Sequence, residues 1–210
     1  KCSQEVNLNK FAGMDCYVGV DLAATSDLTA VAYLVVQDGT YYFKTHYYLP
    51  ESALKDKADK ELYKYWKQQS YLTVTSGNVT DYDYITADML RYADVVNIQS
   101  VGYDKYNATQ WAIDSTEQGL PLEEYPQTLG NFNMPTRELE RLILSGKAVI
   151  DNNEINRYCF RNVTLKSDYN GNVKPNKAVD KKKIDGTIAM IQALGMFLRN
   201  PRFSNEIITI

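Results

Sequence analysis

Apolar residues in the first fifty positions form three runs that are typical of β-strands. The runs cover residues 17–22, 28–36 and 41–49 and are rich in β-branched and aromatic side chains. The dipeptide Asp38-Gly39 separates the second run from the third and accepts the positive φ angles of a tight hairpin turn. This pattern predicts three leading strands in antiparallel order.

The rest of the chain alternates helical and extended patterns. Apolar residues at helical spacing predict helices over residues 52–69, 81–95, 108–118, 134–145 and 181–199. Short extended runs predict strands over residues 98–104 and 122–125, with further extended pieces at 72–75 and between 147 and 177. Leading strands followed by strands that alternate with helices predict an α/β domain with a mixed central sheet and flanking helices.

Composition narrows the class of protein. The chain has 210 residues, 44% hydrophobic and 23% charged, which fits one globular domain with a short extension. Its formal net charge of -3 argues against binding of nucleic acid by overall charge, so a DNA contact needs a local basic patch or a metal ion. No apolar run reaches membrane-spanning length. Because the first residue is lysine, we expect a piece of a longer protein.

The scarcity of cysteine and histidine argues against several kinds of site. Cys2, Cys16 and Cys159 are far apart and show no CxxC spacing, which favours a reducing cytoplasm over a disulfide framework. A single histidine, His46, nearly excludes zinc sites and histidine-based catalytic triads. Carboxylate chemistry with hard metal ions needs no histidine and fits this composition.

Aspartates stand at the ends of three predicted elements. Asp21 ends the first strand, Asp104 ends the strand over 98–104, and Asp185 lies near the start of the last helix. A buried charge needs a partner or a cation, and two divalent ions held by carboxylates can activate water against a phosphodiester. We therefore take these three as candidate catalytic and metal-binding residues, with Asp27 as a fourth candidate ligand. Capping of a turn or a helix is the alternative role for each acid.

Basic residues are frequent just before Asp185. The candidate DNA-binding residues are Lys174, Lys177, Lys181, Lys182, Lys183 and Arg137. An ordinary solvated surface is the alternative interpretation of these side chains. The turn at Asn170-Gly171 predicts a β-hairpin within residues 166–183, which we expect to act as a mobile flap beside the metal site.

Ordered segments across most of the chain resemble one family, the nuclease domain of the large terminase subunit of tailed bacteriophages. The segments include "CYVGVDLAATSDLTAVAYL", "VGYDKYNATQW", "PTRELERLILSGK" and "KKKIDGTIAMIQALG". The resemblance implies a ribonuclease H-like endonuclease domain over residues 13–210. It also implies that residues 1–12 are the remnant of an interdomain linker. The sequence has no G-x-x-x-x-G-K phosphate loop, so we expect the ATPase motor to be absent from this piece.

The same resemblance implies a function and a set of partners. It implies that Asp21, Asp104 and Asp185 bind two Mg²⁺ or Mn²⁺ ions, with Asp27 of the "SDLTA" segment as a secondary candidate. The reaction would be cleavage of double-stranded concatemeric viral DNA during genome packaging. The expected partners are the ATPase domain of the full-length chain, the small terminase and the portal protein. The expected location is the host bacterial cytoplasm, transiently at the procapsid portal and away from membranes.

Two departures from the family pattern and two alternative functions remain. Lys105 stands where relatives often have proline, and Asn156-Arg157-Tyr158 replaces a Leu-Arg-Trp segment of the family. The first alternative is another nuclease of the ribonuclease H fold, such as a resolvase or a transposase. The second is a domain without catalysis that docks the portal or the small terminase. Binding of paired metal ions distinguishes an enzyme from a docking domain.

Overall fold

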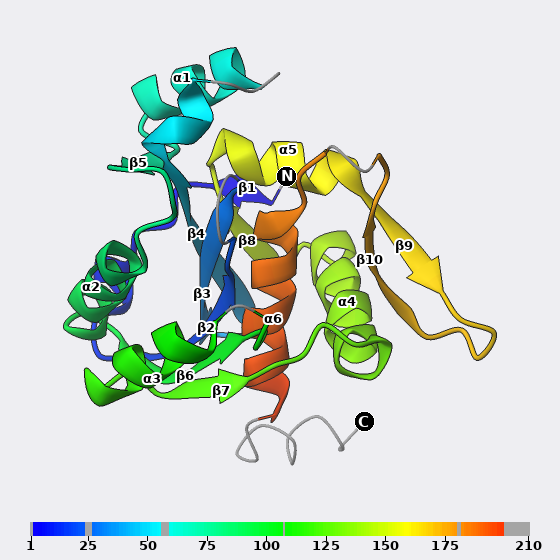
Figure 1. Ribbon diagram of the computed structural model, residues 1–210. Coiled ribbons are helices and arrows are strands. Elements are labelled where there is room, and N and C mark those ends of the chain that lie inside the picture. Colours follow the sequence, from blue (N-terminus) through cyan, green and yellow to red (C-terminus); the bar gives the residue numbers. More distant parts are fainter. Residues whose placement is uncertain (1, 24–26, 56–58, 107, 180–181, 200–210) are drawn as a thin grey trace.

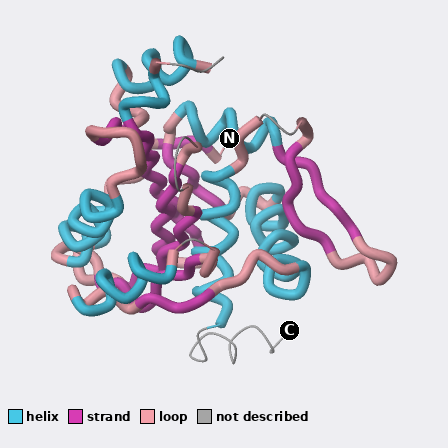
Figure 2. Tube along the Cα trace, viewed as in Figure 1, coloured by secondary structure: helices cyan, strands magenta, loops and turns pink. Residues whose placement is uncertain are grey.

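The computed structural model describes residues 2–23, 27–55, 59–106, 108–179 and 182–199. A mixed sheet with strand order β1-β8-β4-β3-β2-β6-β7 forms its centre, and β5 pairs with β4 beside this path (Figures 1 and 2). The strands of this sheet are β1 (Ser3–Gln4), β2 (Asp15–Asp21), β3 (Thr29–Gln37), β4 (Thr40–Pro50), β5 (Thr73–Thr75), β6 (Asn97–Tyr103), β7 (Leu122–Glu124) and β8 (Ala148–Asp151). A separate two-stranded hairpin consists of β9 (Val163–Ser167) and β10 (Val173–Lys177).

The helices cover both faces of the sheet. The α-helices are α1 (Lys60–Gln68), α2 (Tyr82–Ala93), α3 (Thr109–Glu117), α4 (Leu129–Leu144), α5 (Glu154–Asn162) and α6 (Asp185–Arg199), and short 3-10 turns cover Leu8–Phe11 and Glu51–Leu54. One apolar core lies between the sheet and α4, α5 and α6, and a second lies under α2 and α3. None of the helices in the described residues is long and apolar enough to cross a membrane.

The leading strands confirm the predicted antiparallel order. Strand β2 pairs antiparallel with β3, and β3 pairs antiparallel with β4. Asp38 and Gly39 form the predicted turn between β3 and β4, with φ angles of 51° and 71°. Strand β6 then pairs parallel with β2 on its other side, and β7 pairs parallel with β6. Because the carboxyl ends of parallel strands meet at one sheet edge, Asp21 and the residue after β6, Asp104, come to the same edge.

Helix α6 is buried almost all round and crosses the middle of the sheet (Figure 1). Gly19 of β2 permits this close approach, because a Cβ atom there would lie 2.1 Å from the carbonyl oxygen of Ala189. The contact packs the middle of α6 against β2, and Asp185 at the start of the helix lines the same cavity as Asp21 at the end of β2. The helix pattern in the sequence predicted α6, but the helix begins four residues later than the expected position 181.

Helix α4 begins at Leu129, five residues before the predicted start, although Pro135 lies inside it. The Thr128 side chain accepts a hydrogen bond from the Asn131 amide and caps the helix. Proline has no N–H to bond the carbonyl four residues earlier, which belongs to Asn131. The Tyr125 hydroxyl donates to that carbonyl instead, at 2.7 Å. This substitute bond explains how the helix extends past the proline on its N-terminal side.

Two further predictions of secondary structure were wrong in detail. Between residues 147 and 177, where the sequence predicted extended pieces and no helix, residues 154–162 form α5, in which Ile155 and Cys159 are buried and the Asn153 side chain caps the first turn. The helix expected over 52–69 is divided into the 3-10 turn at Glu51–Leu54 and α1, with residues 56–58 outside the described part.

The N-terminal residues pack on the domain. Strand β1 pairs parallel with β8, and Val6, Leu8 and Phe11 are buried in the core under α2 and α3. The Asp151 carboxylate accepts a hydrogen bond from the Val6 amide at 3.0 Å. Residues 3–11 therefore contribute to the same folded unit as the rest of the described chain.

Candidate active site

A cavity of about 350 Å³ lies at the sheet edge where β2 ends and α6 begins. Its walls come from β2, the connection between β7 and α4, β10 and the start of α6. The residues that line it are Asp21, Gln127, Lys174, Pro175, Asn176, Lys177, Ile184, Asp185 and Ile188. Two of the predicted acids and two of the predicted lysines therefore lie in one cavity.

Asp185 is the more deeply buried of the two acids, with 8% of its surface exposed. Burial raises its pKa above the ordinary value, while backbone N–H groups at the start of α6 and the nearby Lys177 and Lys183 oppose this rise. Its Oδ2 atom is buried and has no hydrogen-bond partner among the described residues. A carboxylate oxygen without a partner in such a place is a suitable ligand for a cation.

Asp21 remains partly accessible through the cavity, yet most of its surroundings are protein. Burial raises its pKa well above the ordinary value, and the negative charge of Asp185 raises it further. A hydrogen bond from Gln127 and the positive charge of Lys177 act in the opposite direction. The two acids therefore repel each other, and a bound divalent cation would relieve that repulsion.

Asp104 lies beside this pair but is occupied by backbone amides. Its two oxygens accept hydrogen bonds from the amides of Tyr106, at 3.0 Å, and Gln127, at 2.9 Å. In the part of the chain that is described, no three His, Cys, Asp or Glu residues lie close enough together to hold a metal ion. The three predicted acids therefore share one end of the sheet without converging on one point.

Asp27 has a different neighbour from the one expected. Its carboxylate is ion-paired with Lys183, whose side chain is only 12% exposed. This ion pair occupies both the fourth candidate ligand and one of the candidate DNA-binding lysines. Asp27 would have to leave Lys183 in order to bind a metal ion.

The other predicted basic residues divide into two groups. Lys174 and Lys177 line the cavity, and the Lys174 ammonium donates to the backbone carbonyl of Gln127 at 3.3 Å. Lys182 lies over the ring of Tyr158, 5.6 Å from its centroid. Arg137 donates to the Gly171 carbonyl at 2.5 Å, and Lys181 lies outside the described residues.

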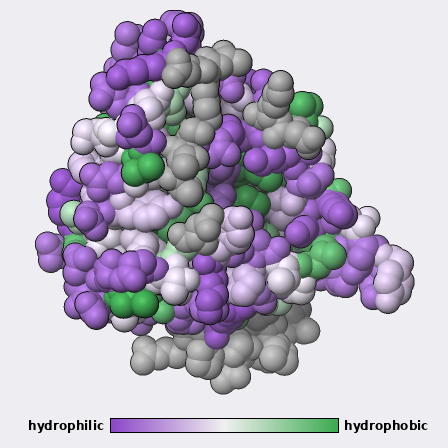
Figure 3. Space-filling view, in the orientation of Figure 1, coloured by the Kyte–Doolittle hydropathy of each residue, from purple (hydrophilic) through white to green (hydrophobic). Residues whose placement is uncertain are grey.

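The predicted hairpin is present as β9 and β10, and it projects from the body with a mainly hydrophilic surface (Figures 1 and 3). Its turn is bonded to α4, because Asn133 accepts from the Val173 amide at 2.9 Å and Arg137 donates to Gly171. Val173 and Pro175 are buried. These contacts tie the turn of the hairpin to α4. The expected role of the hairpin as a mobile flap stays a prediction.

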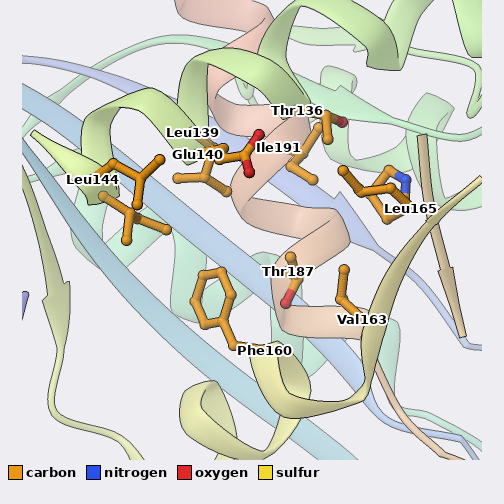
Figure 4. A pocket seen from close by; sticks show the side chains of 11 residues that line it. Thr136, Leu139, Glu140, Leu144, Phe160, Val163, Leu165, Thr187 and Ile191 are labelled. Carbon is orange, nitrogen blue, oxygen red and sulfur yellow. The ribbon is translucent and has the colours of Figure 1, made fainter. Parts of the chain in front are cut away.

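A second cavity, of about 220 Å³, lies between α4, α5, the hairpin and α6 (Figure 4). Its lining is almost entirely apolar and includes Leu139, Phe160, Val163 and Ile191. Because it contains none of the predicted acids, it is not a candidate for the metal chemistry.

Gln127 lines the cavity and bonds two of the predicted acids, but the sequence did not predict its place there. It lies in the connection between β7 and α4, outside any strand or helix, and no motif marks it. Its amide side chain donates to Asp21 Oδ1 at 3.0 Å, while its backbone amide donates to Asp104. Only the folded structure brings this residue between the two acids.

A mixed sheet in which β2, β3 and β4 pair antiparallel and β6 and β7 continue in parallel is the ribonuclease H-like fold, which this chain shares with the large terminase nuclease of phage G20c. Comparison with known families makes this more specific. Residues 3–200 match the endonuclease domain of the terminase large subunit, and the chain belongs to this family.

Individual proteins are similar to this chain over most of its length. Protein YmfN of Escherichia coli (strain K12) is 31% identical over 210 residues, which cover 91% of this chain and 45% of the relative. The large terminase of bacteriophage HK97 has a crystal structure with a TM-score of 0.81 and 27% identity, covering 92% of this chain and 41% of that chain. The chain therefore spans less than half the length of these relatives.

A more distant structure supports the fold alone. The large terminase nuclease of thermophilic phage G20c, solved with bound magnesium, has a TM-score of 0.58 and 12% identity, covering 86% of this chain and 80% of that chain. The same nuclease has also been solved with bound cobalt.

Proposed function

We propose that this domain is a divalent-metal-dependent endonuclease that hydrolyses phosphodiester bonds of double-stranded DNA. The observation that carries the proposal is the buried Oδ2 of Asp185, which has no hydrogen-bond partner in the described part of the chain and lies in a cavity shared with Asp21. Two acids that raise each other's free energy in the absence of a cation are suited to hold one. The family of this chain and the magnesium and cobalt bound to the distant G20c nuclease support the same class of ion.

The ion would be Mg²⁺ or Mn²⁺, and the full site would hold two. Asp21 and Asp185 would provide its central ligands. Asp104 would be a further ligand through lone pairs that its two backbone amides leave free, and Asp27 would be another after it leaves Lys183. Such ions lower the pKa of bound water and stabilise the leaving oxygen of a phosphodiester. The contribution of the chain is to hold negative charge in a partly desolvated cavity.

The lysines of the cavity would receive the phosphate backbone. Lys174 and Lys177 come from β10 and place positive charge beside the acids, where a phosphate has to approach. Lys182 adds positive charge on the adjoining surface, and Arg137 lies where the hairpin meets α4. Because the net charge of the chain is -3, DNA affinity would depend on these local contacts and on metal.

The proposed biological role is cleavage of concatemeric viral DNA during genome packaging. The domain would act within a longer chain that also carries a packaging ATPase. Residues 1–12 would be the end of the linker between them, with residues 3–11 packed on this domain. The small terminase and the portal protein would be its partners in the host cytoplasm and at the procapsid. The family of the chain supports this role over that of a resolvase or a transposase.

Plasmid nicking tests the proposed activity. We expect the domain to nick supercoiled plasmid with Mg²⁺ or Mn²⁺ and to lose this activity in excess chelator. The variants D21N and D185N should lose the activity as well. Asp88 is a buried acid on the other face of the sheet, so the variant D88N is the matched control and should keep it. A docking domain would show no nicking with either metal, and nicking that persists in chelator would contradict a metal-dependent mechanism.

A further inference from the structure

We propose that Gln127 is a positioning residue that orients Asp21 and Asp104 for metal binding and links both acids to the hairpin. This inference rests on the proposed metal-dependent function and concerns how the same site is organised. Gln127 is neither one of the proposed metal ligands nor one of the proposed DNA-binding residues.

Three hydrogen bonds meet at Gln127. The side-chain amide donates to Asp21 Oδ1 at 3.0 Å, and the backbone amide donates to Asp104 Oδ2 at 2.9 Å. The backbone carbonyl accepts from the Lys174 ammonium of β10 at 3.3 Å. One residue therefore contacts an acid from β2, an acid that follows β6 and a lysine of the hairpin.

The connection that carries Gln127 is held on both sides. The Tyr125 amide donates to the Tyr103 carbonyl at 2.6 Å, which extends the pairing between β6 and β7. On the other side, the Pro126 carbonyl accepts from the Thr128 amide and from the Asn131 side chain, both at 2.8 Å. A side chain placed on such a fixed backbone can determine the direction of the group that it bonds.

The chemistry of the amide makes the arrangement specific. A carboxylate accepts hydrogen bonds and does not donate them, so the NH₂ group of Gln127 has to face Asp21. By fixing Oδ1, this bond sets the rotation of the Asp21 carboxylate and leaves Oδ2 free of it. Hydrogen bonds of this kind to metal-binding carboxylates typically account for about 10- to 100-fold in metal affinity.

A purely structural role for Gln127 makes a different prediction. If Gln127 only shapes the connection between β7 and α4, a variant with a side chain of similar length but no hydrogen-bond donor should fold and bind metal like the wild type. Gln110 provides the matched control, because its amide donates to Asp114 Oδ1 at 2.8 Å on the exposed surface of α3. The variants Q127M and Q110M each remove one amide-to-carboxylate bond, but only Q127M removes a bond to an acid of the site.

Electron paramagnetic resonance of free Mn²⁺ measures the affinity directly, without cleavage. We expect Q127M to weaken Mn²⁺ binding by about 10-fold or more, while Q110M stays within twofold of the wild type. The variant Q127A, which also lacks the donor, should show the same loss if Q127M folds poorly. Circular dichroism of the metal-free proteins verifies the fold.

The outcomes separate the inference from the function on which it rests. If the wild type binds no Mn²⁺, the proposed metal site itself fails. If the wild type binds Mn²⁺ and the folded Gln127 variants bind it with less than a fivefold loss relative to Q110M, the positioning role is overturned. A larger loss supports it.

Discussion

Two buried aspartates on opposite faces of the sheet show how differently this fold treats a negative charge. Asp88 of α2 and Asp185 of α6 are each 8% exposed. Asp88 accepts a hydrogen bond from the Tyr48 hydroxyl and is ion-paired with Arg91, so both of its oxygens have partners. Asp185 has a buried oxygen without a partner among the described residues and lies near a second acid, Asp21. Equal burial with unequal pairing distinguishes an acid that is satisfied within the fold from the one that we propose binds a cation.

The surroundings of the two acids extend this contrast. Aromatic rings of Tyr33, His46 and Tyr92 lie near Asp88, with centroids 5.0–5.8 Å apart in contacting pairs. The cavity at Asp185 instead contains acids and lysines. The Asp88 region is therefore packed as a core, whereas the Asp185 region keeps charged groups around an open volume.

The largest expected difference is in catalysis. Replacement of Asp21 or Asp185 by Asn removes a proposed metal ligand, and we expect plasmid nicking to fall by about 1,000-fold, as several kcal/mol of transition-state stabilisation are lost. The D88N variant should nick at close to the wild-type rate when folded. Initial nicking rates under saturating Mg²⁺ provide the measurement. Wild-type rates in D21N or D185N would remove that residue from the site.

The free energy of unfolding should change in the opposite order, with D88N affected more than D185N. D88N disrupts a satisfied buried acid and leaves the Tyr48 hydroxyl with a poorer partner, so we expect a loss of about 1–3 kcal/mol in the free energy of unfolding. D185N removes a buried charge that repels Asp21, so the metal-free variant should be as stable as the wild type or more stable. Urea denaturation in chelator compares them. A D185N variant less stable than D88N would contradict the assignment of the two acids.

The pH dependence of stability should also distinguish the two regions. Asp21 and Asp185 have raised pKa values in the folded state, so they bind more protons there, and stability falls as pH rises from about 3.8 towards those values. Burial lowers the pKa of His46 to about 4 from 6.5, so its contribution rises with pH between these values.

The D185N variant removes one of the acids and lowers the pKa of the other, while His46 is unchanged. We therefore expect its metal-free stability to increase more, or decrease less, than that of the wild type between pH 4.5 and 7. Urea denaturation at both pH values gives the difference. An identical pH dependence in the two proteins would mean that the charge of Asp185 is not penalised by folding.

The smallest expected effect concerns DNA binding. Lys177 lies in the cavity, whereas Lys183 is occupied by Asp27. In chelator, K177A should weaken DNA binding and reduce the slope of log affinity against log salt by about 1, whereas K183A should leave the slope unchanged. Filter binding at salt concentrations between about 50 and 200 mM measures both slopes. Equal slopes in wild type and K177A would exclude a phosphate contact by Lys177.

The sequence predicted the parts of this molecule that depend on local pattern. The apolar runs identified β2, β3 and β4, and the candidate acid Asp21 followed from where the first run stops. Helix α5 was missed because its formation depends on distant contacts, such as Tyr158 against Trp66 with ring centroids 5.2 Å apart. The same reason applies to Gln127, which meets its two acids only after β2, β6 and β7 have paired.

Pairing between charges was also beyond local pattern. The lysines before Asp185 were predicted to bind DNA, yet Lys183 is ion-paired with Asp27, and Lys174 bonds a backbone carbonyl. Which charge remains available for a ligand depends on which partners the fold brings to it. The burial of each charged side chain and the partners that it contacts therefore decide whether it can bind a ligand.

Anomalous diffraction from crystals of the domain soaked in Mn²⁺ tests the central claim most directly. The account predicts a manganese peak in the cavity, within bonding distance of Asp21 and of the buried Oδ2 of Asp185, and no peak at Asp88. Fully ordered acids with no manganese between them at saturating Mn²⁺, or a peak confined to other acids, would contradict it.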